Sequence, residues 1–181
     1  MTRLFVAIEI PVSLSNDIAV VQRRMKESSA QMTCVSPSLM HVTLKFIGEV
    51  DERDVCVISS ALSTVSGAPF SLSTKGIEFN NKRQPRVVWL RMHTVPALFE
   101  LVEKVEQVLV SFGIEKESRR YHPHITIARI KQASPELFTL VDSYQHSFLY
   151  TFDVSSFVLK KSVLTPNGPI YSDISEVVLR G

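Results

Sequence analysis

A short segment of the chain occurs twice, and this internal repeat limits the folds that the chain can adopt. His41-Val42-Thr43-Leu44 recurs in the second half of the chain as His124-Ile125-Thr126-Ile127. Each copy has the pattern His-x-Thr-apolar within an apolar run that predicts a strand. Because side chains at positions i and i+2 of a strand point to the same face, each copy places an imidazole beside a hydroxyl. The repeat therefore predicts two strands, each with one such pair, that can be brought face to face around one small oxygen-rich group.

The apolar pattern predicts strands and helices in alternation. Strands are expected over 3–10, 40–47, 70–79, 86–92, 124–130, 148–154, 155–164 and 170–179, and helices over 14–26, 51–66, 96–112 and 135–144. Several consecutive strands are joined by connections too short for a helical crossover, such as the turn 165–169. The sheets should therefore be antiparallel or mixed, which is typical of an α+β protein.

Composition places the chain among ordinary globular proteins. Of its 181 residues, 45% are apolar and 21% charged, and the length is that of a single domain. A formal charge of +2 is too small to attract polyanions in general, so any binding of nucleic acid needs a local basic surface. Basic residues gather around the predicted strands, where we expect solvated loop charge or an approach for RNA: Lys82, Arg83, Arg86, Arg119, Arg120, Lys131, Lys160 and Lys161.

The cysteines and the apolar opening indicate a cytoplasmic protein. Cys34 and Cys56 fit neither a disulfide framework nor a C-x-x-C motif, and the helical apolar pattern around Cys56 predicts a small core residue. The apolar run 4–8 is interrupted by Glu9 and Pro11, so it is too short for a signal sequence or a membrane span.

Two facing His-x-Thr pairs suit displacement at phosphorus. One imidazole takes a proton from the attacking water while the other protonates the departing oxygen, and two hydroxyls donate to the phosphate. Histidine can play either part near neutral pH, because its ordinary pKa is about 6.5. This chemistry needs neither a metal ion nor a nucleophilic side chain, and the residues do not say which His is the acid.

With these motifs the sequence resembles a known family, the two-histidine phosphoesterases, and in particular RNA 2′,3′-cyclic phosphodiesterases of the LigT/ThpR type. The resemblance covers nearly the whole chain and rests on RLFVAIEIP, HVTLKFIGEV, PRVVWL, YHPHITIAR and the segment from Ser162 to Tyr171. It implies a bilobal α+β fold with two mainly antiparallel β-sheets related by a pseudo-two-fold axis, helices outside and a cleft between. Residues 1–181 would then form a single domain of two intertwined lobes, each contributing one His-x-Thr motif.

The resemblance also implies roles for individual residues. His41 would be the proton donor to the leaving 3′ oxygen, and His124 the acceptor that activates water, which leaves a 2′-phosphate. Thr43 and Thr126 would hold phosphate oxygens. No cofactor or metal is implied. The partners would be RNA with 2′,3′-cyclic phosphate ends, tRNA fragments or small cyclic nucleotides, with no membrane, and the protein would act as a monomer. Joining such an end to a 5′-hydroxyl, as in 2′-5′ RNA ligation, is the reverse reaction expected in vitro.

Phe46 and Arg129 complete the site that the resemblance implies, for base stacking and phosphate contact respectively. Both lie five residues after their His, and in a regular strand an odd offset points to the opposite face. Either the strand ends or bulges there, or these side chains reach around the edge of the sheet.

Two other functions compete with acid–base hydrolysis. His122 and His124 form a His-x-His pair that is able to chelate a metal in a phosphohydrolase, although the sequence shows no obvious third ligand nearby. A non-catalytic module that binds RNA ends or nucleotides is the second alternative.

Trp89, the single tryptophan of the chain, is expected in the core.

Overall fold

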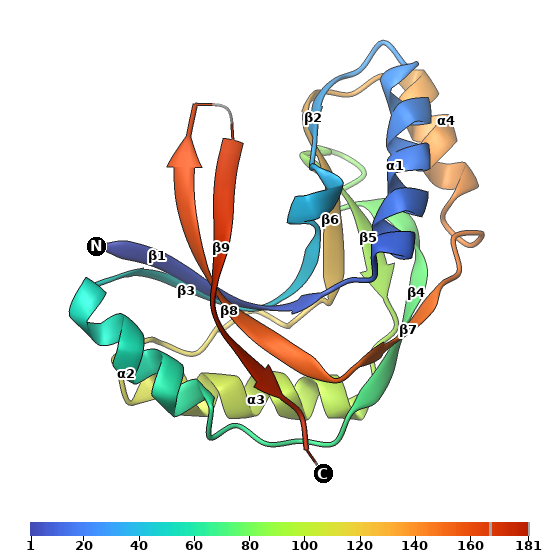
Figure 1. Ribbon diagram of the computed structural model, residues 1–181. Helices are drawn as coiled ribbons and strands as arrows, with labels where there is room; N and C mark the ends of the chain where they lie inside the picture. The colour runs from blue at the N-terminus through green and yellow to red at the C-terminus, as the bar shows by residue number, and fades with distance from the viewer. Residues whose placement is uncertain (167, 181) are drawn as a thin grey trace.

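The computed structural model describes residues 1–166 and 168–180, and within them the chain forms an α+β fold (Figure 1). The strands are β1 (Thr2–Glu9), β2 (Gln31–Cys34), β3 (His41–Val50), β4 (Phe70–Phe79), β5 (Val87–Met92), β6 (His124–Gln132), β7 (Thr151–Val154), β8 (Ser156–Thr165) and β9 (Gly168–Val178). The helices are α1 (Val12–Lys26), α2 (Glu52–Leu62), α3 (Pro96–Val110), α4 (Pro135–Ser143) and the 3-10 turn η1 (Pro37–Leu39).

All the expected strands and helices are present, with differences at their ends. The strand expected to stop at Gly48 continues to Val50, because this glycine accommodates a φ of 89° without leaving the ladder. The short strand β2 and η1 were not predicted. Helix α2 ends at Leu62, earlier than expected, and the prediction of a buried Cys56 is wrong, since its side chain is exposed. Asn167, in the predicted turn 165–169, lies outside the described residues.

The strands form one curled sheet in the order β7-β4-β5-β6-β3-β1-β8-β9, with β2 added beside β6, and every described pair is antiparallel. We call β3, β1, β8 and β9 the first arm, and β6, β5, β4 and β7 the second arm. The two expected sheets are continuous because β3 and β6 pair at the centre, where Val42 lies opposite Ile125. These residues hold the same position in the two repeats, so the pseudo-two-fold axis passes between them.

The helices cover the outside of the sheet and connect the arms (Figure 1). Helix α1 follows β1 of the first arm but packs against β6 of the second, next to α4. Helix α3 follows β5 of the second arm but packs against β3 of the first, next to α2. No helix among the described residues is long and apolar enough to cross a membrane.

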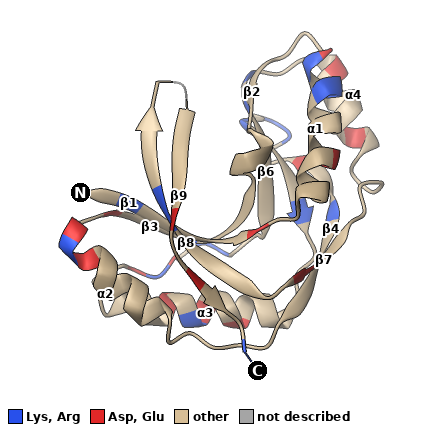
Figure 2. Cartoon of the chain, in the orientation of Figure 1, with Lys and Arg blue, Asp and Glu red and all other residues tan. Residues whose placement is uncertain are grey.

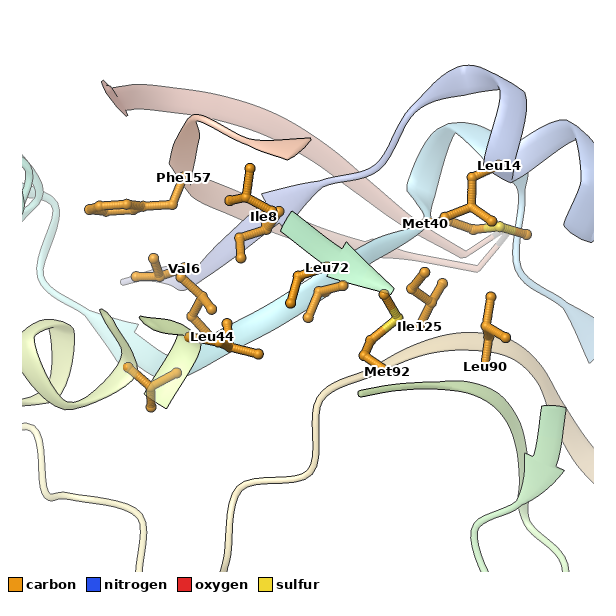
Figure 3. Packing of buried hydrophobic residues seen from close by; sticks show 14 of the residues in the cluster. Val6, Ile8, Leu14, Met40, Leu44, Leu72, Leu90, Met92, Ile125 and Phe157 are labelled. Carbon is orange, nitrogen blue, oxygen red and sulfur yellow. The ribbon is translucent and has the colours of Figure 1, made fainter. Parts of the chain in front are cut away.

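A continuous apolar core lies between the sheet and these helices. Figure 3 shows Val6, Leu44 and Phe157 of the first arm, and the row continues to Leu90 and Ile125 of the second. Helical spacing builds the facing surface: the buried side chains of α1 recur every three or four residues, as do those of α3. Removing these apolar surfaces from water is the main force that holds the two arms together.

Substitution of Gly76 tests how closely β4 packs against the backbone around Gln145. The φ of this glycine is 142°, and a Cβ atom there would lie 1.8 Å from the carbonyl oxygen of Gln145. We expect Gly76→Ala to lower the free energy of unfolding by about 2–4 kcal/mol, since the clash is with backbone that has to move. Gly67→Ala is the matched control, because nothing lies within 4 Å of its Cβ position. Urea denaturation measures both, and equal stabilities of the two variants would contradict the close packing.

Candidate active site

The central strands bring the four motif side chains to one face of the sheet. With Val42 opposite Ile125, the antiparallel register sets His41 across from Thr126, and Thr43 across from His124. Val42 and Ile125 are fully buried on the helix side, whereas the four polar side chains are half-buried on the other side. Each imidazole therefore has one hydroxyl on its own strand and another on the neighbouring strand.

Matching bulges explain how Phe46 and Arg129 reach the same face. In β3, Thr43 and Lys45 pair with consecutive residues of β1, so Leu44 is an extra residue in the ladder. In β6, Thr126 and Ala128 pair with consecutive residues of β5, so Ile127 is the extra residue. A bulge shifts the alternation of side chains along the strand by one position. A residue five positions after the histidine therefore points to the same face of the sheet as the histidine.

A cavity of about 310 Å³ collects all six predicted site residues. Phe46 is 73% exposed at its mouth, and Arg129 is exposed as well. The walls that sequence reasoning missed come from β2 and η1 on one side and from the β8–β9 hairpin on the other, and they include Cys34, Val35, Leu39, Pro169 and Tyr171. The only sequence signal for Tyr171 was its place in the segment from Ser162 to Tyr171. A wider groove of about 930 Å³ is also lined by Phe46 and contains none of the four motif side chains.

Each imidazole is held in one tautomer by a backbone carbonyl two residues earlier in the chain. Nδ1–H of His41 donates to the carbonyl oxygen of Leu39 at 2.8 Å, and Nδ1–H of His124 donates to that of His122 at 2.7 Å. A carbonyl oxygen can only accept, so the proton of each neutral ring resides on Nδ1. In the neutral ring, Nε2 therefore carries a lone pair that can take a proton. In the charged ring, Nε2 carries an N–H that can donate one.

Aromatic rings fix the plane of each imidazole. Phe5 and Tyr171 pack against His41 with ring centroids 4.9 and 5.6 Å away, and Trp89 packs against His124 at 4.4 Å. The expectation that Trp89 is a core residue is therefore wrong in part: it is half-buried and supports a motif histidine. Tyr121 adds to the frame, since its hydroxyl donates to the carbonyl oxygen of Thr43 at 2.9 Å.

Burial lowers the pKa of both imidazoles below its ordinary value. For His41 the charges of Lys160 and His124 lower the pKa further, while the Leu39 carbonyl and the Glu9 carboxylate raise it. For His124 the charges of Arg91 and His122 lower the pKa, and the His122 carbonyl raises it. The charge of His124 acts on His41, so the two rings belong to one electrostatic site.

Two other predicted residues lie elsewhere than expected. The ring of His122 is exposed, and its backbone carbonyl accepts the hydrogen bond from Nδ1 of His124. Within the described part of the chain, no three His, Cys, Asp or Glu side chains are grouped so that they could hold a metal ion. Lys160 is not a loop charge: it lies within β8 with 7% of its surface exposed and is paired with Glu9 and Asp173.

Two imidazoles and two hydroxyls that face one cavity from pseudo-symmetric strands are the arrangement of the two-histidine phosphoesterases. The family described as LigT like Phosphoesterase matches residues 8–89 and 93–171, and the chain belongs to this family.

Named relatives and solved structures are similar over nearly the full length. The RNA 2′,3′-cyclic phosphodiesterase of Archaeoglobus fulgidus is 34% identical over 173 residues, which cover 95% of this chain and 97% of that protein. The protein of the same name from Thermotoga maritima is 32% identical and covers 99% of this chain and 96% of its own length. The crystal structure of E. coli LigT complexed with 3′-AMP has a TM-score of 0.82 at 25% identity, with 99% of each chain covered.

The hydrogen bonds to Nδ1 predict the tautomer of both motif histidines. We expect ¹⁵N NMR at a pH above their titration to show Nδ1 protonated and Nε2 unprotonated in His41 and His124, because each carbonyl accepts only from a protonated Nδ1. The exposed His93 serves as the reference ring in the same spectrum. An Nε2–H signal from either motif histidine would contradict the geometry.

Proposed function

We propose that this protein hydrolyses the 2′,3′-cyclic phosphodiester at the end of an RNA, or of a small cyclic nucleotide, to a 2′-phosphate without a metal ion. The observation that carries the proposal is the convergence of two imidazoles on one cavity, each with Nδ1 occupied and Nε2 left for a ligand. The relatives named above carry this activity in their names, which supports the same substrate class for this chain.

In the proposed reaction the two histidines divide the proton transfers. Nε2 of His124 takes a proton from water, whose oxygen attacks phosphorus and forms the new P–O bond. The bond from phosphorus to the 3′ oxygen breaks, and Nε2–H of His41 protonates that oxygen. His41 ends neutral and His124 ends charged, so one proton exchange with solvent restores the starting state.

The remaining site residues bind the substrate in this proposal. The hydroxyls of Thr43 and Thr126 donate to the non-bridging phosphate oxygens, where charge builds up during attack. Arg129 offers a guanidinium whose paired N–H groups suit a phosphate. Phe46 presents an exposed ring on which any base can stack, which provides affinity with little discrimination.

Substitution of each motif residue tests the mechanism. We expect His41→Ala and His124→Ala each to lower turnover of an RNA ending in 2′,3′-cyclic phosphate by about 10²–10⁴-fold, the usual effect of losing one acid or base. Thr43→Ala and Thr126→Ala should cost less, about 1.5–3 kcal/mol of transition-state stabilisation each. Rates are followed by chromatography of the RNA ends, which also identifies the hydroxyl that keeps the phosphate.

The alternatives give different results in the same assay. Near-full activity of both His variants would refute acid–base catalysis by this pair. Loss of activity with a chelator, and its return with zinc, would favour a metal site at His122 and His124. An RNA end that is bound but chemically unchanged would identify a binding module.

The lowered pKa values predict the pH dependence of kcat/KM. Activity needs one neutral and one protonated imidazole, so the bell-shaped profile is centred midway between the two pKa values of the free enzyme. Both lie below the ordinary value of about 6.5, and we therefore expect the centre below that pH. The rate falls at higher pH as the acid loses its proton, and at lower pH as the base gains one. A profile centred above pH ~7 would contradict this expectation.

A further inference from the structure

The strand neighbours of the two histidines carry opposite charges. In the ladder between β1 and β3, Glu9 lies directly opposite His41. In the ladder between β5 and β6, Arg91 lies directly opposite His124. The backbone geometry around the two imidazoles is nearly the same, but one has a carboxylate beside it and the other a guanidinium.

Two carboxylates and one ammonium lie behind His41. The ammonium of Lys160 contacts the carboxylates of both Glu9 and Asp173, the latter at 2.5 Å, so one cation serves two anions. Lys160 is almost completely buried in β8, which lies between β1 and β9 in the sheet, and this position holds the three groups together. Figure 2 shows a basic and an acidic segment close together near the base of the β8–β9 hairpin.

The balance of positive and negative charge beside His124 is different. Nη1 of Arg91 donates to Glu78 at 2.7 Å, so one cation has one anion. Nε of Arg91 is buried and has no hydrogen-bond partner among residues 1–166 and 168–180. The guanidinium charge is therefore less fully compensated than the ammonium charge of Lys160.

We propose that these two ion-pair clusters break the symmetry of the site, so that Glu9 and Arg91 act as positioning residues that keep His41 charged as the acid and His124 neutral as the base. The inference rests on the proposed function and adds to it the residues that assign the two roles. A carboxylate stabilises a neighbouring imidazolium, and a guanidinium destabilises one.

Other charged and aromatic groups also face the two rings. Around His41 these are Lys160 on β8, Tyr171 on β9 and His124 on β6. Of the charges that act on this ring within the described part of the chain, that of Glu9 raises its pKa. Around His124 they are Arg91 and the neighbouring His122, and both lower its pKa. The charge of Lys160 lowers the pKa of His41 more than that of Glu9 raises it, even though Glu9 and Asp173 share this ammonium. The difference between the rings is that a carboxylate acts on His41, whereas both charges acting on His124 are positive.

Titration of each ring by NMR tests the proposal on the full chain without any need for activity. In the wild-type protein, we expect the pKa of His41 to lie above that of His124. Arg91→Gln should raise the pKa of His124 by about 0.5 pH unit or more and leave His41 nearly unchanged, whereas Glu9→Gln should lower the pKa of His41 by a similar amount. Arg91→Lys and Glu9→Asp keep the charges and are the matched controls, with shifts near zero.

Kinetics then connect the rings to their roles. Arg91→Gln should move the acidic limb of the kcat/KM profile to higher pH by the pKa shift seen for His124. Glu9→Gln should move the alkaline limb to lower pH by the pKa shift seen for His41. The proposal is overturned if the wild-type order of the pKa values is reversed, if the charge-removing variants shift neither ring, or if the conservative variants shift them equally. A wild-type protein that shows the expected titrations but no turnover would instead refute the proposed function.

Discussion

The antiparallel contact between β3 and β6 is the interaction on which the site depends. Val42 and Ile125 meet there with their side chains fully buried, and the hydrophobic effect that holds them on the helix side forces the histidines and threonines to the opposite side. Because the contact lies on the pseudo-two-fold axis, one pairing positions both halves of the site. The helices reinforce it, since α1 and α3 each follow a strand of one arm and pack against the central strand of the other.

The two arms share their backbone geometry and differ in chemistry. Both central strands carry an extra residue just after the threonine, and both return to the cavity three residues beyond that threonine, with Phe46 in one arm and Arg129 in the other. The first suits a base and the second a phosphate. The strand neighbours of the two histidines also differ, since Glu9 is negatively charged and Arg91 is positively charged. A symmetric backbone thus sets two imidazoles at matching positions with unlike side chains beside them, as the proposed division of the proton transfers requires.

Local patterns were sufficient for much of the fold. Apolar alternation and helical spacing located the long strands and helices, and short connections indicated antiparallel pairing, because these features depend on neighbours in sequence. They missed β2 and η1, which are too short to show a period. They misplaced Cys56 and Lys160, since burial depends on which elements cover a helix or strand. The direction of Phe46 and Arg129 stayed open, because a bulge is a property of a ladder between two strands.

The sequence by itself determined the reactive groups: two His-x-Thr pairs, each with imidazole and hydroxyl on one face of a strand, because strand periodicity is a local property. Only the tertiary structure decided that the pairs share a cavity, that Nε2 is the nitrogen left for a ligand, and that opposite charges lie beside the two rings. These features arise from strands far apart in the chain, whose register is set by burial of the apolar core and by backbone hydrogen bonds that no spacing within one segment records.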